Sequence, residues 1–361
     1  MTVNTHSPAA NTLAEFDIVI PLFRIRWNTR AVLEGLTHHY QPRSIHIITP
    51  TSEVTTLRSM AADWAIAPLQ VHAEETFFGT DSLSKEAICA ELELGKSLYN
   101  PGWFYQQLLK LGAFEGIENL SEWYVVWDSD LLPVATWQLL REGDSGIERP
   151  FALIQHNAYG NSAIVSKWDK WINMVLGVEP LTAPVGTFVP HHMWFKQEHL
   201  KSFAHQLNRY FETDTHWLKL MMRSANDFGT FSEFWSYVSW VAERAPQDLA
   251  FYPYEKYGDT TERFFDDGTG LFSAALIRYL ANSPVAAVRE CDRFSPSYAE
   301  VDGFIRDEYG LDALPSSLSF ESSPRHLKKN EDTMHIEERR SRWNPRNAES
   351  RDVSDPELMT A

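Results

Sequence analysis

The sequence predicts an α/β fold in which a mostly parallel central sheet is flanked by helices. Short apolar segments rich in β-branched and aromatic residues recur at 16–23, 45–49 and 123–127, and such segments are typical of buried strands. Amphipathic segments at 29–39 and 53–64 alternate with them. This order indicates parallel strands with right-handed crossovers. The length of 361 residues fits a single large domain with tails.

The composition argues against a nucleic-acid or anionic-membrane partner. Forty-nine acidic residues stand against 32 Lys and Arg, for a formal net charge of -17, which opposes broad attraction to polyanions. A phosphate-bearing substrate would therefore need a metal or a few placed cations. Aromatic residues are 13% of the chain and 13 residues are Trp; these can stack on sugar rings, or simply fill a core.

Cysteine use and hydropathy indicate a cytoplasmic protein. The two cysteines, Cys89 and Cys291, show neither metal-ligand spacing nor a disulfide framework, which suits a reducing compartment. The segment 1–15 is polar and lacks an apolar signal core. No segment approaches the roughly 20 apolar residues of a membrane span, so we expect no integral membrane association.

The remaining elements follow from periodicity and from turn residues. Pro21 marks the point where the first strand leaves the sheet, and Asn28 is a plausible N-cap for the first helix. The segment 254–270 is dense in Tyr, Asp and Gly and is expected to be a loop. Further strands are expected at 69–72, 151–154 and 249–253. Further helices are expected at 82–98, 103–114, 135–141, 162–176, 197–211, 214–223 and 232–244, and the segments 273–280, 285–288 and 298–308 are expected to complete the folded part.

Two acids follow the apolar segment 123–127. If the backbone stays extended through Ser129, Asp128 and Asp130 project to the same side, at the strand end where open α/β sheets bind ligands. Paired carboxylates repel each other unless a cation lies between them, and oxygen ligands of this kind suit Mg²⁺ or Mn²⁺. In the alternative interpretation Asp128 caps a turn and Asp130 is a solvated loop acid.

The helix expected at 103–114 carries polar residues that share helical faces. Trp103, Gln107 and Lys110, or Gln106 and Lys110, are spaced by three or four residues. Two glutamines and a lysine on an aromatic helix can contact sugar hydroxyls or phosphate. They can equally form an ordinary solvated face.

A histidine pair follows the Gly- and Pro-containing segment 178–189. His191 and His192 lie beside a short apolar strand, where either imidazole is a candidate metal ligand or phosphate contact; a structural role is the alternative. Because adjacent strand residues alternate sides, we expect one of them to approach Asp128 and the other to face away.

Glu233 lies near a helix start among aromatic residues. It follows Thr230 by three residues, which is the spacing of a capping box. Alternatively, the apolar bulk of Phe231 and Phe234 would raise the pKa of the Glu233 carboxyl toward that of a general base.

Several of these motifs together resemble a bacterial, largely uncharacterised glycosyltransferase-like family of the GT-A, or nucleotide-diphospho-sugar transferase, type. They are the strand Asp17–Leu22, the helix Gly102–Lys110, the strand end Val126–Asp130, and His191 to Met193 with the later Ser232-Glu233. The resemblance runs from about residue 16 to residue 290. It is specific in the Gln-Gln helix and the Asp-x-Asp strand end.

The resemblance implies a Rossmann-type sheet merged with an acceptor region. A divalent ion, Mn²⁺ or Mg²⁺, would bridge Asp128 and Asp130 to a sugar diphosphate, with His191 or His192 completing its ligands. Glu233 and Asp130 are the expected catalytic residues. The residues expected to bind the donor are Pro21, Trp103, Gln106, Gln107, Lys110 and Asp128. The partners would be a nucleotide-diphospho-sugar and a saccharide or other hydroxyl acceptor; donor sugar and stereochemistry are left open.

The expected organisation is one catalytic domain at 15–321. Its nucleotide-sugar half covers about 15–133 and its acceptor half about 134–321. A flexible segment, 1–14, precedes it. From 322 to 361 the composition shifts to charged and polar residues, which predicts a disordered tail.

Two other functions fit parts of the sequence. A phosphohydrolase of the haloacid dehalogenase type also carries Asp-x-Asp after an apolar strand, and Asp266-Asp267 would then hold Mg²⁺. Against this, the acids follow three expected strands, and Leu131 and Leu132 replace the usual Gly and Thr. The other possibility is a non-catalytic nucleotide-sugar-binding protein on the same fold.

Overall fold

The computed structural model describes most of the chain between residues 16 and 321. The described residues are 16–136, 140–142, 148–153, 162–181, 188–189, 191–252, 261–264, 266–281, 294–311 and 314–321. They form two compact units. The described part of the first unit falls within 16–25, 41–129 and 137–258, and that of the second within 26–40, 130–136 and 259–321.

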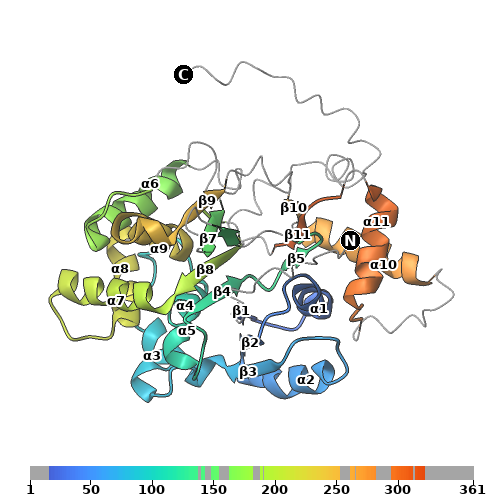
Figure 1. Cartoon of the computed structure of the whole chain (residues 1–361). Coiled ribbons are helices and arrows are strands. Elements are labelled where there is room, and N and C mark those ends of the chain that lie inside the picture. The colour runs from blue at the N-terminus through green and yellow to red at the C-terminus, as the bar shows by residue number, and fades with distance from the viewer. Residues whose placement is uncertain are drawn as a thin grey trace, which may run out of the picture. The chain divides into compact units, whose positions relative to one another are not determined.

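The first unit is built on a five-stranded sheet in the order β3-β2-β1-β4-β8 (Figure 1). The first four strands of that order are parallel, and β8 runs antiparallel to β4. This mostly parallel sheet with flanking helices confirms the predicted α/β class. Its strands are β1 Asp17–Pro21, β2 Ser44–Thr49, β3 Leu69–Ala73, β4 Trp123–Trp127 and β8 His192–Lys196.

Helices of the first unit pack against this sheet and against one another. Helix α2, Thr51–Ala61, lies along β3, and α4, Pro101–Leu111, lies along β1. The N-terminus of α4 is set locally, because Pro101 occupies its first turn and the Asn100 side chain accepts a hydrogen bond from the Trp103 N–H at 3.0 Å. Its other helices are α3 Lys85–Cys89, α5 Ala113–Gly116, α6 Ser162–Trp171 with a π-helical continuation Ile172–Leu176, α7 Gln197–Phe211, α8 Trp217–Phe228, α9 Glu233–Arg244 and the 3₁₀ turns Glu74–Thr76, Asp81–Leu83 and Pro246–Asp248.

The core of the first unit explains why the segment 123–127 is apolar throughout. Alternate residues of β4, Tyr124 and Val126, join a large cluster that includes Phe104 from α4 and Phe234 from α9. The intervening Val125 and Trp127 are also fully buried. A strand that is covered on both faces has a continuous run of apolar residues rather than alternating apolar and polar residues.

The second unit has its own small sheet and core. Strands β10 Thr261–Phe264 and β11 Ser317–Phe320 are parallel, and β11 pairs antiparallel with β5, Leu131–Pro133. The indole of Trp27 stacks on Phe272 and meets the edge of Phe320. Its helices are α1 Thr29–Tyr40, α10 Asp266–Ala281 and α11 Tyr298–Tyr309.

The predicted helix at 82–98 was wrong for most of its length. The structure keeps only α3, whose N-cap Ser84 accepts a hydrogen bond from the Ala87 N–H at 3.2 Å, and continues from Ala90 in turns. Gly95 has a φ of +81°, a conformation that ends helical geometry. The apolar periodicity of this segment therefore reflects packing of a short helix and a loop.

Two further expectations failed because long-range pairing decided the structure. Residues 140 and 141, at the end of the helix expected at 135–141, lie instead in β6 (Leu140–Glu142), which pairs with β7, Glu148–Leu153. Strand β7 also pairs with β9, Ala250–Tyr252. The segment 254–270, expected as a loop, contains β10 and the start of α10. The segment 285–288 and the tails at 1–14 and 322–361 lie outside the described residues. The functional halves at 15–133 and 134–321 remain predictions.

Asp17, His46 and His72 lie next to one another inside the sheet of the first unit. Asp17 is fully buried and pairs with Arg43, and the Ser121 N–H donates to its Oδ2 at 2.9 Å. His46 Nδ1 lies 3.2 Å from His72 Nε2. Burial, with the nearby His46 and Arg58, lowers the pKa of His72 to about 4. The fold therefore holds His72 neutral.

This low pKa predicts that stability falls as pH falls. An unfolded histidine, with a pKa of about 6.5, takes up a proton before the folded one. The penalty therefore begins below about pH 6.5 and is complete below about pH 4. Between pH 7 and 5 it should amount to about 1 kcal/mol, less than full linkage because the ring is partly exposed.

Urea unfolding at pH 7 and at pH 5 tests this effect. His72→Gln should remove about 1 kcal/mol of the loss between the two pH values. His205→Gln is the matched control, because His205 is exposed on α7. Equal pH dependence in His72→Gln and the wild type would contradict a buried neutral His72.

Candidate functional site

Asp128 lies directly after β4, at the edge of the sheet where its parallel strands end. The backbone there is tied to the neighbouring strand segment, because the Asp128 N–H donates to the His191 carbonyl at 2.8 Å. Residues 129 and 130 then form a turn, so the chain does not stay extended through Ser129 as the sequence prediction assumed. The Asp128 side chain is 16% exposed.

His191 comes to Asp128 because β8 is the antiparallel neighbour of β4. Trp127, the last residue of β4, is in register with His192, the first residue of β8, so the residues just beyond this pair lie side by side. His191 Nδ1 lies 2.9 Å from Asp128 Oδ2. The φ of His191 is +63°, an uncommon value for a non-glycine residue and one that accumulates at functional sites.

Asp128, Asp130 and His191 form a group that could hold a metal ion. Each offers one ligand atom, and these atoms lie within 4.8 Å of one another. Two carboxylates and an imidazole are a donor set that suits a divalent ion such as Mn²⁺. The turn at Ser129 thus brings the two carboxylates together, although by a different backbone path from the one expected.

Lys110 reaches the same carboxylate from α4. Its side chain is 5% exposed, and Nζ lies 2.6 Å from Asp128 Oδ1 and 2.7 Å from Glu233 Oε1. The ammonium also lies 4.6 Å from the centre of the Phe234 ring, a cation–π distance. The solvated-face interpretation of Lys110 was therefore wrong, because this lysine is a buried cation between two acids.

The charges of this cluster stabilise one another. Burial would lower the pKa of Lys110, but Asp128 and Glu233 outweigh it and hold that pKa well above its usual range. Burial would likewise raise the pKa of Asp128, but Lys110 and His191 hold it well below its usual range. Both groups are therefore charged at neutral pH.

Glu233 is the first residue of α9, and its side chain does not serve the predicted capping box. The N-cap is Ser232, which accepts a hydrogen bond from the Trp235 N–H. The Glu233 carboxylate instead pairs with Lys110, and its backbone N–H donates to Gln107 Oε1 at 3.3 Å. The capping prediction was wrong because the helix begins two residues later than Thr230 would require.

The other predicted site residues lie in well-defined surroundings. Gln107 is buried, and its Nε2 has no hydrogen-bond partner among the described residues. Gln106 is half-buried, and Trp103 stacks on Tyr99 with ring centres 3.9 Å apart. The remaining two, Pro21 and His192, are placed by the sheet: Pro21 pairs in register with Ile48, and the His192 ring lies 4.8 Å from that of Trp127.

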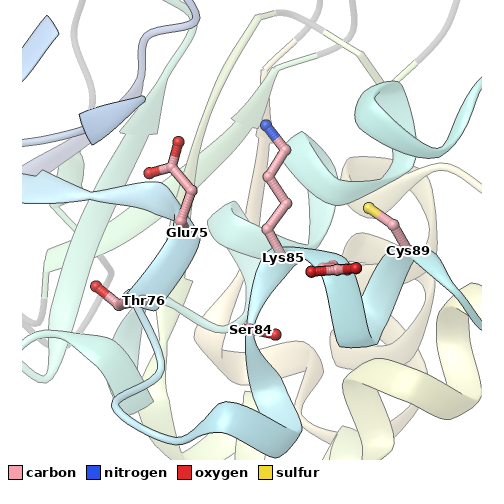
Figure 2. A pocket seen from close by; sticks show the side chains of 6 residues that line it. Glu75, Thr76, Ser84, Lys85 and Cys89 are labelled. Carbon is pink, nitrogen blue, oxygen red and sulfur yellow. The ribbon is translucent and has the colours of Figure 1, made fainter. Parts of the chain in front are cut away.

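A separate cavity of about 510 Å³ lies beside α3 (Figure 2). Lys85, which is labelled in Figure 2, forms an ion pair with Glu74. Glu75 accepts a hydrogen bond from the Thr51 hydroxyl at 2.7 Å. Burial raises the pKa of the Cys89 thiol to about 11, so it is unreactive at neutral pH. The cavity therefore offers little chemistry of its own. Its lining residues are Glu75, Thr76, Ser84, Lys85, Glu86 and Cys89.

The sequence did not predict that Glu233 forms hydrogen bonds with both Lys110 and Gln107. The available signal was the spacing of Gln107 and Lys110, which places both on one face of α4. Nothing in the spacing shows that this face meets the start of α9.

Among the described residues, no helix is long and apolar enough to cross a membrane.

Comparison with solved structures finds glycosyltransferases at low identity. Mouse xyloside xylosyltransferase 1 is 10% identical with a TM-score of 0.37, covering 70% of this chain and 87% of that one. The galactosyltransferase LgtC, solved with donor and acceptor sugar analogues, is also 10% identical with a TM-score of 0.37, covering 91% and 95%. The glycosyltransferase GlyE of Streptococcus pneumoniae TIGR4 is 10% identical with a TM-score of 0.34, covering 93% and 64%. TM-scores this low do not establish a shared fold.

No curated protein matches the chain. A family model, in contrast, matches residues 26–264. This range is more than half of the chain and includes Lys110, the Asp128–Asp130 turn, His191 and Glu233. The chain therefore belongs to the family of unknown function DUF6492.

Proposed function

We propose that this protein is a metal-dependent glycosyltransferase that moves a sugar from a nucleotide-diphospho-sugar to a hydroxyl acceptor. The observation that carries the proposal is the group of Asp128, Asp130 and His191, whose ligand atoms lie within 4.8 Å of one another at the ligand-binding edge of a mostly parallel sheet. The acidic net charge of -17 makes a local cation site necessary for a diphosphate.

The donor chemistry of this group fits Mn²⁺ or Mg²⁺. Asp128, Asp130 and His191 would hold the ion, which when bound neutralises the charge that develops on the departing nucleoside diphosphate. The fit rests on the donor set, since two carboxylates and one imidazole offer ligand atoms within 4.8 Å of one another. Asp128 Oδ1 lies 2.6 Å from Lys110 Nζ, so an ion at this oxygen would come close to the ammonium.

Donor contacts are proposed for residues on α4 and at the end of β1. Gln107 Nε2 is a buried donor without a described partner, so it can reach a sugar or phosphate oxygen that enters beside Glu233. Gln106, Trp103 and Pro21 remain proposed donor contacts on the strength of the motif alone. Asp128 would act at the diphosphate through the ion, whereas the Lys110 ammonium is proposed to attract the diphosphate by its own charge.

Glu233 is proposed as the group that accepts the proton of the acceptor hydroxyl, with Asp130 assisting at the ion. Its Oε1 is held by Lys110, while its Oε2 makes no hydrogen bond to any described residue. The carboxylate is 8% exposed and is therefore oriented by the protein rather than by water. One oxygen is thus fixed and the other is available to a substrate hydroxyl.

Hydrolysis of a panel of nucleotide sugars with and without Mn²⁺ tests the proposed function. Slow, Mn²⁺-dependent release of sugar and nucleoside diphosphate supports a glycosyltransferase. Activity on a generic aryl phosphate would instead favour the Asp-x-Asp phosphohydrolase. Tight donor binding with no turnover on any acceptor would favour a non-catalytic binding protein.

Glu233→Gln tests the proposed base. At saturating donor and Mn²⁺ it should lower kcat by about 100-fold or more, because an amide cannot accept the proton. Glu74→Gln is the matched control, because the Glu74 side chain is also 8% exposed and pairs with Lys85 rather than with Lys110. Turnover at the wild-type rate in Glu233→Gln would show that Glu233 is not the base and has a structural role. It would also favour a retaining mechanism, which needs no such base.

A further inference from the structure

Lys110 contacts Asp128, which is one of the three residues that could hold a metal ion. We propose that Lys110 competes with the divalent ion for Asp128, so that the ion binds weakly alone and firmly only together with a diphosphate. This inference presupposes the metal site of the proposed function. It goes beyond that function by assigning to Lys110 control over the order in which ion and donor bind.

The contacts of Asp128 show the competition directly. Its Oδ1 lies 2.6 Å from Lys110 Nζ, and its Oδ2 lies 2.9 Å from His191 Nδ1. An ion that takes Oδ1 must come close to the ammonium, and two cations at one oxygen repel each other strongly in a poorly solvated site. The ion can therefore bind Oδ1 fully only if Lys110 withdraws.

Glu233 gives Lys110 a second partner to which it can withdraw. Its Oε1 lies 2.7 Å from Nζ, in a well-directed hydrogen bond. The centre of the Phe234 ring, 4.6 Å from Nζ, gives the ammonium a further favourable contact next to Glu233. Lys110 can leave Asp128 and remain buried and paired, so release of Asp128 does not leave an isolated buried charge.

The charge of the cluster favours joint binding of ion and diphosphate. Asp128, Asp130 and Glu233 carry three negative charges, and Lys110 cancels one of them. This reduces the attraction for a lone divalent ion. A diphosphate that arrives with the ion supplies negative oxygens, which offset the repulsion between the ion and the ammonium.

Two variants separate competition from net charge. Lys110→Met removes the competitor and makes the cluster more negative. Lys110→Met with Glu233→Gln removes the competitor and leaves two negative charges, as in the wild type. The double variant also avoids an unpaired buried carboxylate at position 233. Lys196→Met is the matched control, because Lys196 pairs with Asp248 at 2.9 Å, at the other end of β8.

Binding of Mn²⁺ alone is measured by calorimetry and by the electron paramagnetic resonance signal of the free ion. Both Lys110 variants should bind Mn²⁺ about tenfold or more tightly than the wild type, the order expected for a close buried charge interaction. Lys196→Met should match the wild type. With uridine diphosphate present as the probe diphosphate, the difference between the wild type and the double variant should narrow.

Three outcomes would overturn the inference, and they are distinguishable. If the double variant binds Mn²⁺ no more tightly than the wild type, Lys110 has only a structural role while the metal site stands. If the double variant does not fold, Lys110 is again structural. If neither the wild type nor any variant binds Mn²⁺, with or without uridine diphosphate, the metal site of the proposed function fails and the inference fails with it.

Discussion

Asp128→Asn is expected to abolish Mn²⁺-dependent binding of nucleotide-diphospho-sugars, with an affinity loss of about 100-fold or more. The substitution preserves size but removes an anionic ligand. It also breaks the pairs that Asp128 makes with Lys110 and His191. Because Lys110 keeps Glu233 as a partner, the cost in unfolding free energy should be limited to about 1–3 kcal/mol.

Calorimetry with a panel of donors, with and without Mn²⁺, measures this effect. Asp130→Asn should also weaken Mn²⁺-dependent binding. Asp248→Asn is the control, because it removes a paired carboxylate of the first unit that contacts Lys196 and His199 rather than the cluster. Unchanged Mn²⁺-dependent affinity of Asp128→Asn for every donor would remove Asp128 from the metal site.

Lys110→Met is expected to lower the free energy of unfolding by about 3–5 kcal/mol without Mn²⁺, the usual result of removing one partner from a buried ion pair. The loss arises because Asp128 and Glu233, whose side chains are only 16% and 8% exposed, are left with no cation between them. Adding Glu233→Gln should recover part of the loss, since one of the two acids is then neutral.

Urea unfolding of the wild type, both single variants and the double variant measures this coupling. The interaction energy between positions 110 and 233 should exceed about 1 kcal/mol. Lys196→Met should cost at most about 1 kcal/mol, because that pair is more exposed. A cost for Lys110→Met no larger than that of Lys196→Met would contradict a buried pair at the site.

Local pattern was sufficient for the fold class and for the acidic strand end. Alternation of apolar segments with amphipathic ones identified the four parallel strands β1 to β4. This was possible because strands buried on both faces consist of short, continuous runs of apolar residues. The run of five apolar residues before Asp128 indicated a buried strand ending in a ligand site. The sequence also singled out each of Lys110, Asp128, His191 and Glu233, without relating Lys110 to the acids.

Local pattern failed where long-range contacts set the structure. The segment 140–142 forms a strand because it pairs with β7, and the end of the 82–98 segment is set by turns that include Gly95 at φ +81°. Intrinsic propensity is a weak preference over so few residues. Pairing with a neighbouring strand readily overrides it.

The sequence by itself determined the α/β class, the acids at the end of β4 and the polar residues worth testing. Only the tertiary structure decided that Lys110 from α4 and Glu233 from α9 meet at Asp128, and that His191 arrives through the antiparallel register of β8. The reason is physical. Periodicity records which face of its own element a residue occupies, whereas an ion pair between segments depends on which elements become neighbours in the sheet and its helices.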